Sequence, residues 1–123
     1  FAATFQAQPG SLAEWVEAGR SEVARREIPA LVLTLGRRGI LAFAGGRVYH
    51  AAAPAVEAVN AAGSGDAVSG VLAYRRSLGD SWEDALRWSA ATGAAVALTE
   101  GTAECRVEDV ERLHPLTQVK EIA

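Results

Sequence analysis

The sequence has 123 residues, of which 50% are hydrophobic, and its formal net charge is −3. That length suits one domain, residues 1–123, and that composition supports a packed core and excludes a disordered chain. A mildly acidic domain gives no electrostatic reason to expect nucleic acid or a membrane surface as a partner. No apolar run reaches about 20 residues, the length of a membrane-spanning helix, so no membrane span is expected.

Cysteine and histidine give no sign of a disulfide or a metal site. Cys105 is the only cysteine, so no disulfide can form within the chain, and a reducing, cytoplasmic setting is the default expectation. His50 and His114 lie far apart and belong to no motif with metal-ligand spacing, so we interpret both as surface or edge residues. The chain begins with Phe1 rather than Met, which indicates a processed or truncated product.

The first elements follow from caps, periodicity and turns. Ser11 and Glu14 form a capping box that predicts a helix over residues 12–27, ended before Pro29. The continuous apolar run that follows is typical of a strand covered on both faces, and Gly45-Gly46 is a two-residue hairpin signal. Three strands are therefore expected, over residues 30–35, 40–44 and 47–51.

The second half of the chain is mostly helical. A helix is expected over residues 64–78, and Ser81 with Asp84 caps the next helix, which is rich in alanine and glycine. A short helix over residues 107–113 and a last strand over residues 118–122 complete the chain. Because helices and strands alternate, we predict a layered α/β fold with a mainly parallel sheet and the glycine hairpin near one edge.

The segment of residues 60–67, Asn-Ala-Ala-Gly-Ser-Gly-Asp-Ala, carries most of the chemical information. Two glycines flank a serine directly before a helical pattern, where they permit a sharp turn and the close approach of another molecule. The amides of Gly63, Ser64 and Gly65 would then project from a helix N-terminus, which favours an anion. Asp66, in the first helical turn, could accept a proton from a substrate hydroxyl that attacks a phosphoryl group.

A purely structural interpretation of the same residues stays open at this point. Glycine followed by an acid is common at helix starts, and an aspartate there is favourable through the helix dipole alone. The tetrapeptide Gly-Ser-Gly-Asp is a weak motif by itself. It is not a Walker-type phosphate loop, because no Gly-Lys-Ser/Thr follows.

A longer, ordered series of motifs resembles the C-terminal signature of the PfkB carbohydrate kinases. The series begins with Val-Leu-Thr-Leu-Gly at residues 32–36, continues through the glycine hairpin and residues 60–66, and closes with an alanine-rich helix and Gly101-Thr102. It covers residues 30–122. The resemblance implies the C-terminal portion of a ribokinase-like fold. It also implies ATP-dependent transfer of a phosphoryl group to a hydroxyl of a sugar or sugar phosphate.

The resemblance implies a role for each matching residue. Asp66 would be the general base, and the anion hole for the transferring phosphoryl group would be formed by Gly63, Ser64 and Gly65. The cofactor-binding residues would be Thr34, Gly36 and Gly39 along the ATP phosphates, Asn60 in the loop, and Ala90 and Gly93 near the adenine. A buried strand threonine at position 34 and plain turn glycines at positions 36 and 39 are equally open. Within the family, an asparagine at position 60 and a serine at position 64 resemble the residues of the 1-phosphofructokinase and tagatose-6-phosphate kinase branch.

Part of such a kinase is expected to lie outside this chain. Kinases that resemble it bind the sugar mainly through an N-terminal half, which also carries a lid and an Asn-x-x-Glu metal motif. Asn60 is the one asparagine, and no glutamate stands three residues after it. The implied cofactors are therefore ATP and Mg²⁺, with the metal motif absent from this chain.

We expect the 123 residues alone to be inactive. The site would be completed by a missing N-terminal half or by another chain of an oligomer, and the partners of the complete enzyme would be ATP and a sugar phosphate. A non-catalytic nucleotide-binding module and a purely structural α/β domain are the alternatives.

Overall fold

The computed structural model describes residues 11–35, 38–53, 64–98 and 105–122. Its elements in chain order are α1 (Leu12–Arg26), β1 (Ala30–Thr34), β2 (Ile40–Ala44), β3 (Arg47–Ala52), α2 (Ser64–Ser77), α3 (Trp82–Ala97), α4 (Val107–Leu113), the 3-10 turn η2 (His114–Leu116) and β4 (Gln118–Glu121). Every helix and strand expected from the sequence is present. Where the sequence predicted a range, each end lies within one residue of it.

Both predicted helix caps are confirmed. The Ser11 hydroxyl oxygen accepts a hydrogen bond from the amide of Glu14 at 3.2 Å, and the hydroxyl donates to the Glu14 carboxylate, also at 3.2 Å. The Ser81 hydroxyl oxygen accepts from the amide of Asp84 at 3.1 Å. Such caps satisfy amides that have no partner within the helix, and each typically stabilises by about 1 kcal/mol.

The described sheet is antiparallel, so the expectation of a mainly parallel sheet is wrong for these strands. The strand order is β1-β2-β3-β4, and all three neighbouring pairs are antiparallel. For the β1–β2 and β2–β3 pairs, the physical reason is the length of the connections. Residues 35–39 join β1 to β2 and Gly45-Gly46 joins β2 to β3, whereas parallel strands need a crossover of a dozen or more residues. The glycine hairpin therefore joins the two central strands and not strands at an edge.

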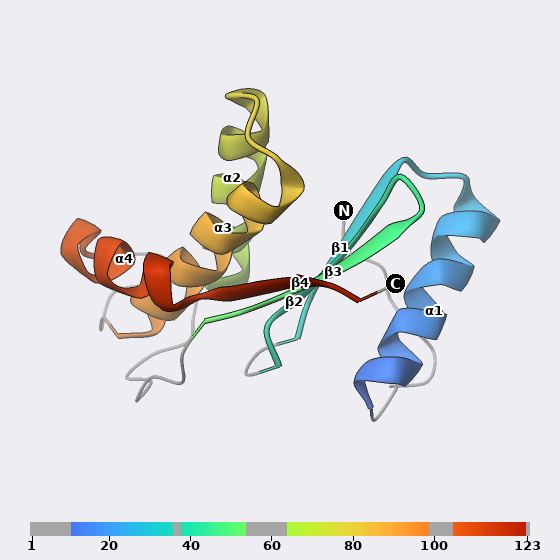
Figure 1. Cartoon of the computed structure of the whole chain (residues 1–123), viewed down its shortest axis with the longest axis horizontal. Coiled ribbons are helices and arrows are strands. Elements are labelled where there is room, and N and C mark those ends of the chain that lie inside the picture. The colour runs from blue at the N-terminus through green and yellow to red at the C-terminus, as the bar shows by residue number, and fades with distance from the viewer. Residues whose placement is uncertain (1–10, 36–37, 54–63, 99–104, 123) are drawn as a thin grey trace.

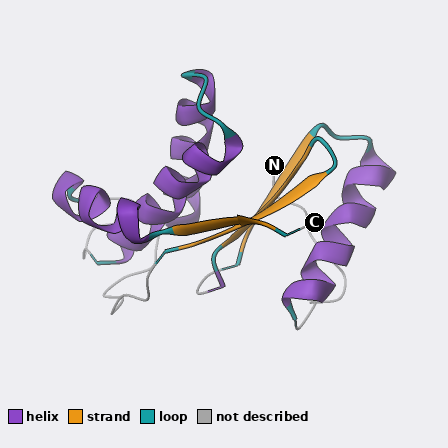
Figure 2. Cartoon of the chain, viewed as in Figure 1, coloured by secondary structure: helices purple, strands orange, loops and turns teal. Residues whose placement is uncertain are grey.

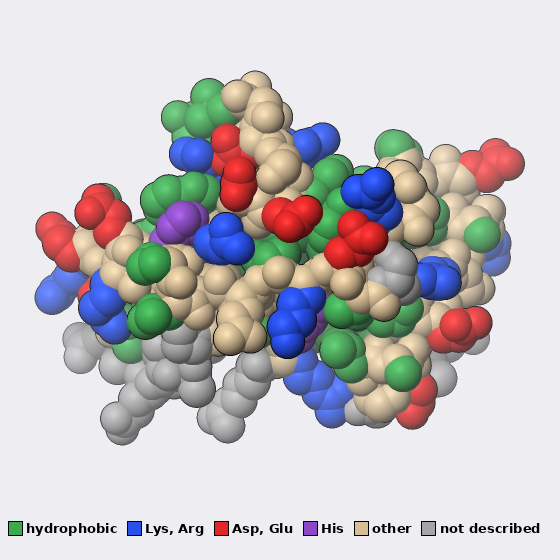
Figure 3. Space-filling view, viewed as in Figure 1, with side chains coloured by type: hydrophobic (Ala, Val, Ile, Leu, Met, Phe, Trp, Pro, Cys, Tyr) green, Lys and Arg blue, Asp and Glu red, His purple; other side chains and the backbone are tan. Residues whose placement is uncertain are grey.

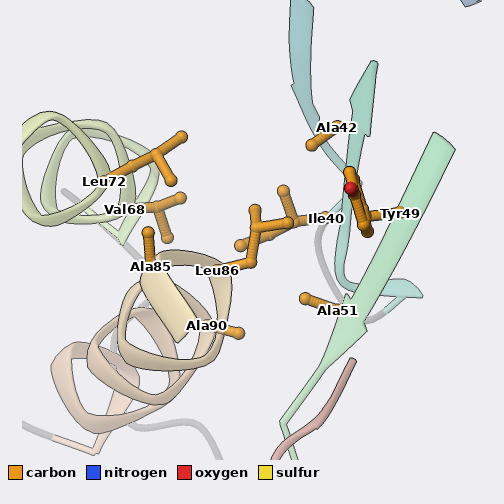
Figure 4. Packing of buried hydrophobic residues seen from close by; sticks show 9 residues of the cluster. All are labelled: Ile40, Ala42, Tyr49, Ala51, Val68, Leu72, Ala85, Leu86 and Ala90. Carbon is orange, nitrogen blue, oxygen red and sulfur yellow. The ribbon is translucent and has the colours of Figure 1, made fainter. Parts of the chain in front are cut away.

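Helices cover both faces of this sheet (Figures 1 and 2). Successive side chains of a strand point to opposite faces, so one strand can contribute side chains to a hydrophobic core on each face. On one face α1 packs against Leu31, Leu33, Leu41, Phe43 and Val48. On the other face α2 and α3 pack against Ile40, Ala42, Tyr49 and Ala51 (Figure 4). This two-sided burial explains the uninterrupted apolar run in the sequence.

Gly19 sets how closely α1 approaches the sheet. A Cβ atom built on Gly19 would lie 2.1 Å from Cζ of Phe43. The Phe43 side chain is 3% exposed, in the middle of the sheet. A side chain at position 19 therefore has no room unless the helix or the ring moves.

We predict that Gly19→Ala destabilises the chain although alanine is the better helix former. Overpacking against Phe43 should lower the free energy of unfolding by about 1–3 kcal/mol. Gly70→Ala is the matched control, because Gly70 also lies inside a helix but no described residue comes within 4 Å of an added Cβ. It should raise the free energy of unfolding by about 0.5–1 kcal/mol. Urea unfolding of both variants checks this, and a Gly19→Ala chain as stable as wild type would contradict it.

A ring stack attaches the C-terminal segment to α3. The rings of Trp88 and His114 lie 3.8 Å apart between centroids with an interplanar angle of 24°, and the Arg75 guanidinium lies 5.1 Å from the centroid of the Trp88 ring. Burial, together with the charges of Arg87 and Arg75, lowers the pKa of His114 below its usual 6.5, against a smaller opposing effect of Asp84. Folding therefore favours the neutral imidazole.

We predict that His114 makes stability depend on pH. In the unfolded chain its pKa returns to the usual 6.5, so below that value the unfolded state binds a proton that the folded state does not. The free energy of unfolding should be highest above this pH and should fall as the pH drops toward the lower folded pKa. His114→Phe keeps a ring against Trp88 but does not titrate. Urea unfolding at several pH values should give a flatter profile for the variant, and identical profiles would contradict the prediction.

Candidate functional site

The end of β1 and the start of α2 meet in space. Thr34 is the last residue of β1, Gly65 is the second residue of α2, and a Cβ built on Gly65 would lie 3.9 Å from Oγ1 of Thr34. The Thr34 side chain is exposed, so its interpretation as a buried strand threonine is wrong. The fold thus brings together two motifs that are distant in the sequence. A contact between Thr34 and ATP stays a prediction.

Asp66 presents its carboxylate at the surface of the first turn of α2. Its side chain is exposed. Within the described ranges, no hydrogen bond or ion pair engages this carboxylate, whereas the nearby Ser69 hydroxyl donates to the Gly65 carbonyl at 3.1 Å. A carboxylate that has no partner among the described residues can accept a proton from a bound molecule.

The start of α2 offers backbone donors to an anion. The first four N–H groups of an α-helix have no partner within it, and the helix dipole favours negative charge there. Ser64 is the first helical residue, while Gly63 and Asn60 lie outside the described residues. The anion hole therefore stays a prediction. The described part of the motif, Ser64 and Gly65, lies at a helix start, as that prediction requires.

Gly65 is not required by the backbone conformation of the helix. Its φ is not among the positive values found for other glycines, and the nearest atom to an added Cβ is Oγ1 of Thr34, at ordinary contact distance. Among the described residues, only Oγ1 of Thr34 comes within 4 Å of a Cβ built on Gly65. The described residues therefore give no structural reason for a glycine at position 65.

Gly39, in contrast, is required by the fold. Its φ is +90°, and a Cβ there would lie 2.1 Å from the carbonyl oxygen of Ala51 in β3. The amide of Leu35 donates to the Gly39 carbonyl at 2.8 Å and closes the turn. The structure thus gives Gly39 a turn role, and its expected contact with ATP stays a prediction. Gly36 lies outside the described residues.

His50 is a residue of this region that the sequence analysis missed. Its Nε2 lies 2.5 Å from the carbonyl oxygen of Arg38, in the turn that follows Thr34. The sequence indicated only a histidine in a strand outside any motif. Because its partner is a main-chain carbonyl, which every residue has, the sequence could not have predicted this contact.

The two residues expected near the adenine lie in different environments on α3. Ala90 is 6% exposed, and its methyl group belongs to the core between α3 and the sheet (Figure 4). Gly93, almost one turn later, is partly exposed. An adenine contact stays a prediction for both, and Gly93 has the better access.

The described donors suit a phosphate group better than a metal ion. Across residues 11–35, 38–53, 64–98 and 105–122, no group of three or more His, Cys, Asp or Glu side chains could hold a metal ion. Mg²⁺ is usually held by one or two carboxylates together with substrate phosphates, so the Mg²⁺ expected with ATP stays a prediction. Amides at a helix start and the Thr34 hydroxyl are donors that an ATP phosphate accepts.

The surface carries no large region of one charge on the face that Figure 3 shows. Acidic and basic side chains alternate across it. In the described segments, no helix combines the length and the apolar character that crossing a membrane requires.

Comparison with known proteins decides the family. Residues 1–109 match the pfkB family carbohydrate kinases. The chain belongs to this family. The ATP-dependent 6-phosphofructokinase isozyme 2 of Mycobacterium tuberculosis (strain CDC 1551 / Oshkosh) is 34% identical over 103 residues, which are 84% of this chain and 28% of that protein. The D-beta-D-heptose 7-phosphate kinase of Bordetella bronchiseptica is 37% identical over 76 residues, 62% of this chain and 24% of that protein. This PfkB chain thus spans about a quarter of the length of these curated relatives.

Solved structures of sugar kinases share the fold of this PfkB chain. Phosphofructokinase-2 from Escherichia coli in complex with potassium matches with a TM-score of 0.78 and 23% identity, over 86% of this chain and 34% of that one. Fructokinase from Vibrio cholerae O395, bound to fructose, ADP and a calcium ion, matches with a TM-score of 0.69 and 27% identity, over 80% of this chain and 34% of that one. The expected ribokinase-like fold is confirmed for this portion.

We predict that the two site glycines respond differently to alanine. Gly39→Ala should lower the free energy of unfolding by about 1–3 kcal/mol through backbone strain, to which the clash with Ala51 adds. Gly65→Ala should leave it unchanged or raise it by up to about 1 kcal/mol. The same Gly65→Ala change should weaken nucleotide binding, because its methyl group lies where a phosphate would approach. Urea unfolding and nucleotide titration check both, and loss of stability without loss of binding in Gly65→Ala would contradict it.

Proposed function

We propose that this chain is the nucleotide-binding and catalytic-base portion of an ATP-dependent kinase that phosphorylates a hydroxyl of a sugar phosphate. The observation that carries the proposal is the meeting of Thr34 with Gly65 at a helix start that presents the exposed Asp66. Family membership supports the reaction class. Two relatives are named as kinases of sugar phosphates, 6-phosphofructokinase isozyme 2 and D-beta-D-heptose 7-phosphate kinase.

The proposed chemistry divides the work between backbone and side chain. The amides at the start of α2 hold the transferring phosphoryl group and stabilise the charge that develops on its oxygens. The Thr34 hydroxyl donates to a phosphate oxygen from the side of β1. Asp66 takes the proton from the sugar hydroxyl as the hydroxyl oxygen attacks the γ-phosphorus of ATP, and the bond from that phosphorus to the β-phosphate oxygen breaks, so that ADP leaves. Phosphate charge would be neutralised by Mg²⁺ bound with ATP, and we propose that its protein ligands come from the sugar-binding portion.

The sugar is proposed only at the level of a class. Asn60 and Ser64 favour a substrate of the 1-phosphofructokinase or tagatose-6-phosphate kinase type, while the names of the relatives favour fructose 6-phosphate or a heptose 7-phosphate. We propose that a sugar-binding portion, from the same longer protein or from a second chain, completes the site in a cytoplasmic enzyme. A nucleotide-binding module without catalysis is the alternative, and it has no need of a base at position 66.

We predict that Asp66→Asn abolishes turnover in the protein that joins this chain to its sugar-binding portion. Loss of a general base should lower kcat by about a hundred- to ten-thousandfold, while the affinity for ATP stays within a few-fold. The measurement is a coupled kinase assay with fructose 1-phosphate, tagatose 6-phosphate, fructose 6-phosphate and a heptose 7-phosphate as acceptors.

Asp84→Asn is the matched control for this variant. Asp84 is also an exposed aspartate in the first turn of a helix, α3, where its amide, and not its carboxylate, completes the cap. Its kcat should equal that of wild type, and both variants should unfold at similar urea concentrations. An Asp66→Asn enzyme that turns over at the wild-type rate would remove the base assignment and leave the binding module as the better function.

A further inference from the structure

The turn between β1 and β2 is held against β3 by a histidine. His50 lies in β3 directly opposite Leu41 of β2, and its partly exposed ring contacts the turn that precedes β2. Its Nε2 lies 2.5 Å from the carbonyl oxygen of Arg38. A carbonyl oxygen only accepts hydrogen bonds, so Nε2 must carry the hydrogen.

A second contact holds the same turn to the same strand. Gly39 lies so close to the Ala51 carbonyl that no side chain fits between them. His50 and Ala51 are consecutive residues of β3, so they fix consecutive residues of the turn, Arg38 and Gly39. One contact is a hydrogen bond and the other is a steric fit, and together they restrain the turn in two directions.

Hydrogen bonds carry this restraint back to the proposed nucleotide site. The amide of Arg38 donates to the Leu35 carbonyl at 3.2 Å, and the amide of Leu35 donates to the Gly39 carbonyl at 2.8 Å. Leu35 follows Thr34, whose hydroxyl lies beside Gly65 at the start of α2. A continuous path therefore runs from the His50 ring, through the main chain of the turn, to the end of β1.

We propose that His50 is a positioning residue of the nucleotide site: its Nε2–H bond to the Arg38 carbonyl fixes the turn and so holds Thr34 against the start of α2. The proposal rests on the proposed function, in which Thr34 and the α2 amides meet ATP. His50 lies on the α1 face of the sheet, with Val48, whereas Thr34 points to the α2 face. It therefore acts through the backbone and does not touch the nucleotide.

The first test measures the turn itself in this chain. Hydrogen exchange of the Leu35 and Arg38 amides, followed by NMR, reports how often the turn opens. His50→Leu removes the donor and should speed both exchange rates about fivefold, the equilibrium equivalent of one typical hydrogen bond. His50→Gln offers an amide N–H donor and should restore the wild-type rates. Amides inside α3 should exchange equally in all three proteins, which shows that the fold is kept.

The second test connects the turn to the ligand. ADP titrated into the chain and followed by NMR should bind about fivefold more weakly to His50→Leu than to wild type, with recovery in His50→Gln. Lys120→Leu is the matched control, because Lys120 is exposed and lies opposite His50 in the β3–β4 register. Its dissociation constant should equal that of wild type. The nitrogen spectrum of the His50 ring should show the hydrogen on Nε2.

Each outcome has a distinct meaning. Unchanged exchange of the Leu35 and Arg38 amides in His50→Leu would overturn the positioning role, and so would a hydrogen carried only on Nδ1. Faster exchange with an unchanged dissociation constant for ADP would overturn the link to the nucleotide site. A wild-type chain that does not bind ADP at all would count against the proposed function, while the exchange rates would still decide whether His50 holds the turn.

Discussion

The burial of β2 on both of its faces is the constraint on which the rest of the structure depends. Four consecutive residues, Ile40, Leu41, Ala42 and Phe43, are at most 3% exposed. Alternate residues of β2 face opposite layers. The helix α1 therefore packs against Leu41 and Phe43, and the helices α2 and α3 pack against Ile40 and Ala42. Burying one such large apolar side chain contributes about 1.5–3 kcal/mol. Neither helical layer can therefore shift along the sheet without loss of core contacts.

The candidate site is a consequence of that registration. Val68 and Leu72 anchor α2 to the same core as Ile40, which directs the start of the helix toward the end of β1. The proposed site would be built from main-chain amides, the Thr34 hydroxyl and the Asp66 carboxylate. Backbone groups are fixed by the fold and need no reorganisation when charge develops on a phosphoryl group. The chemistry therefore depends on how accurately the sheet holds β1 beside α2.

Local features of this chain could be predicted from the sequence, because their causes are local. Serine caps and the Gly45-Gly46 turn each act within a few residues, and they located the helix starts and the turn correctly along the chain, although not the position of the hairpin within the sheet. Strand direction could not be predicted from burial, since an apolar run looks the same in a parallel sheet and in an antiparallel sheet covered on both faces.

The candidate site was predictable only in part, for the same reason. The motif at residues 60–66 indicated the helix start and Asp66, but the exposure of Thr34 and the core position of Ala90 depend on packing between distant segments. The contact of His50 with the main-chain carbonyl of Arg38 could not be predicted, because every residue carries such a carbonyl.

The strand order has a practical consequence at β1. Among the described strands, β1 pairs with β2 along one side only. Its sequence, Ala-Leu-Val-Leu-Thr, contains neither a charge nor a proline that would discourage another strand from pairing there. Open apolar edges of this kind favour association between copies of a chain. A lysine introduced near this edge should therefore weaken any such association.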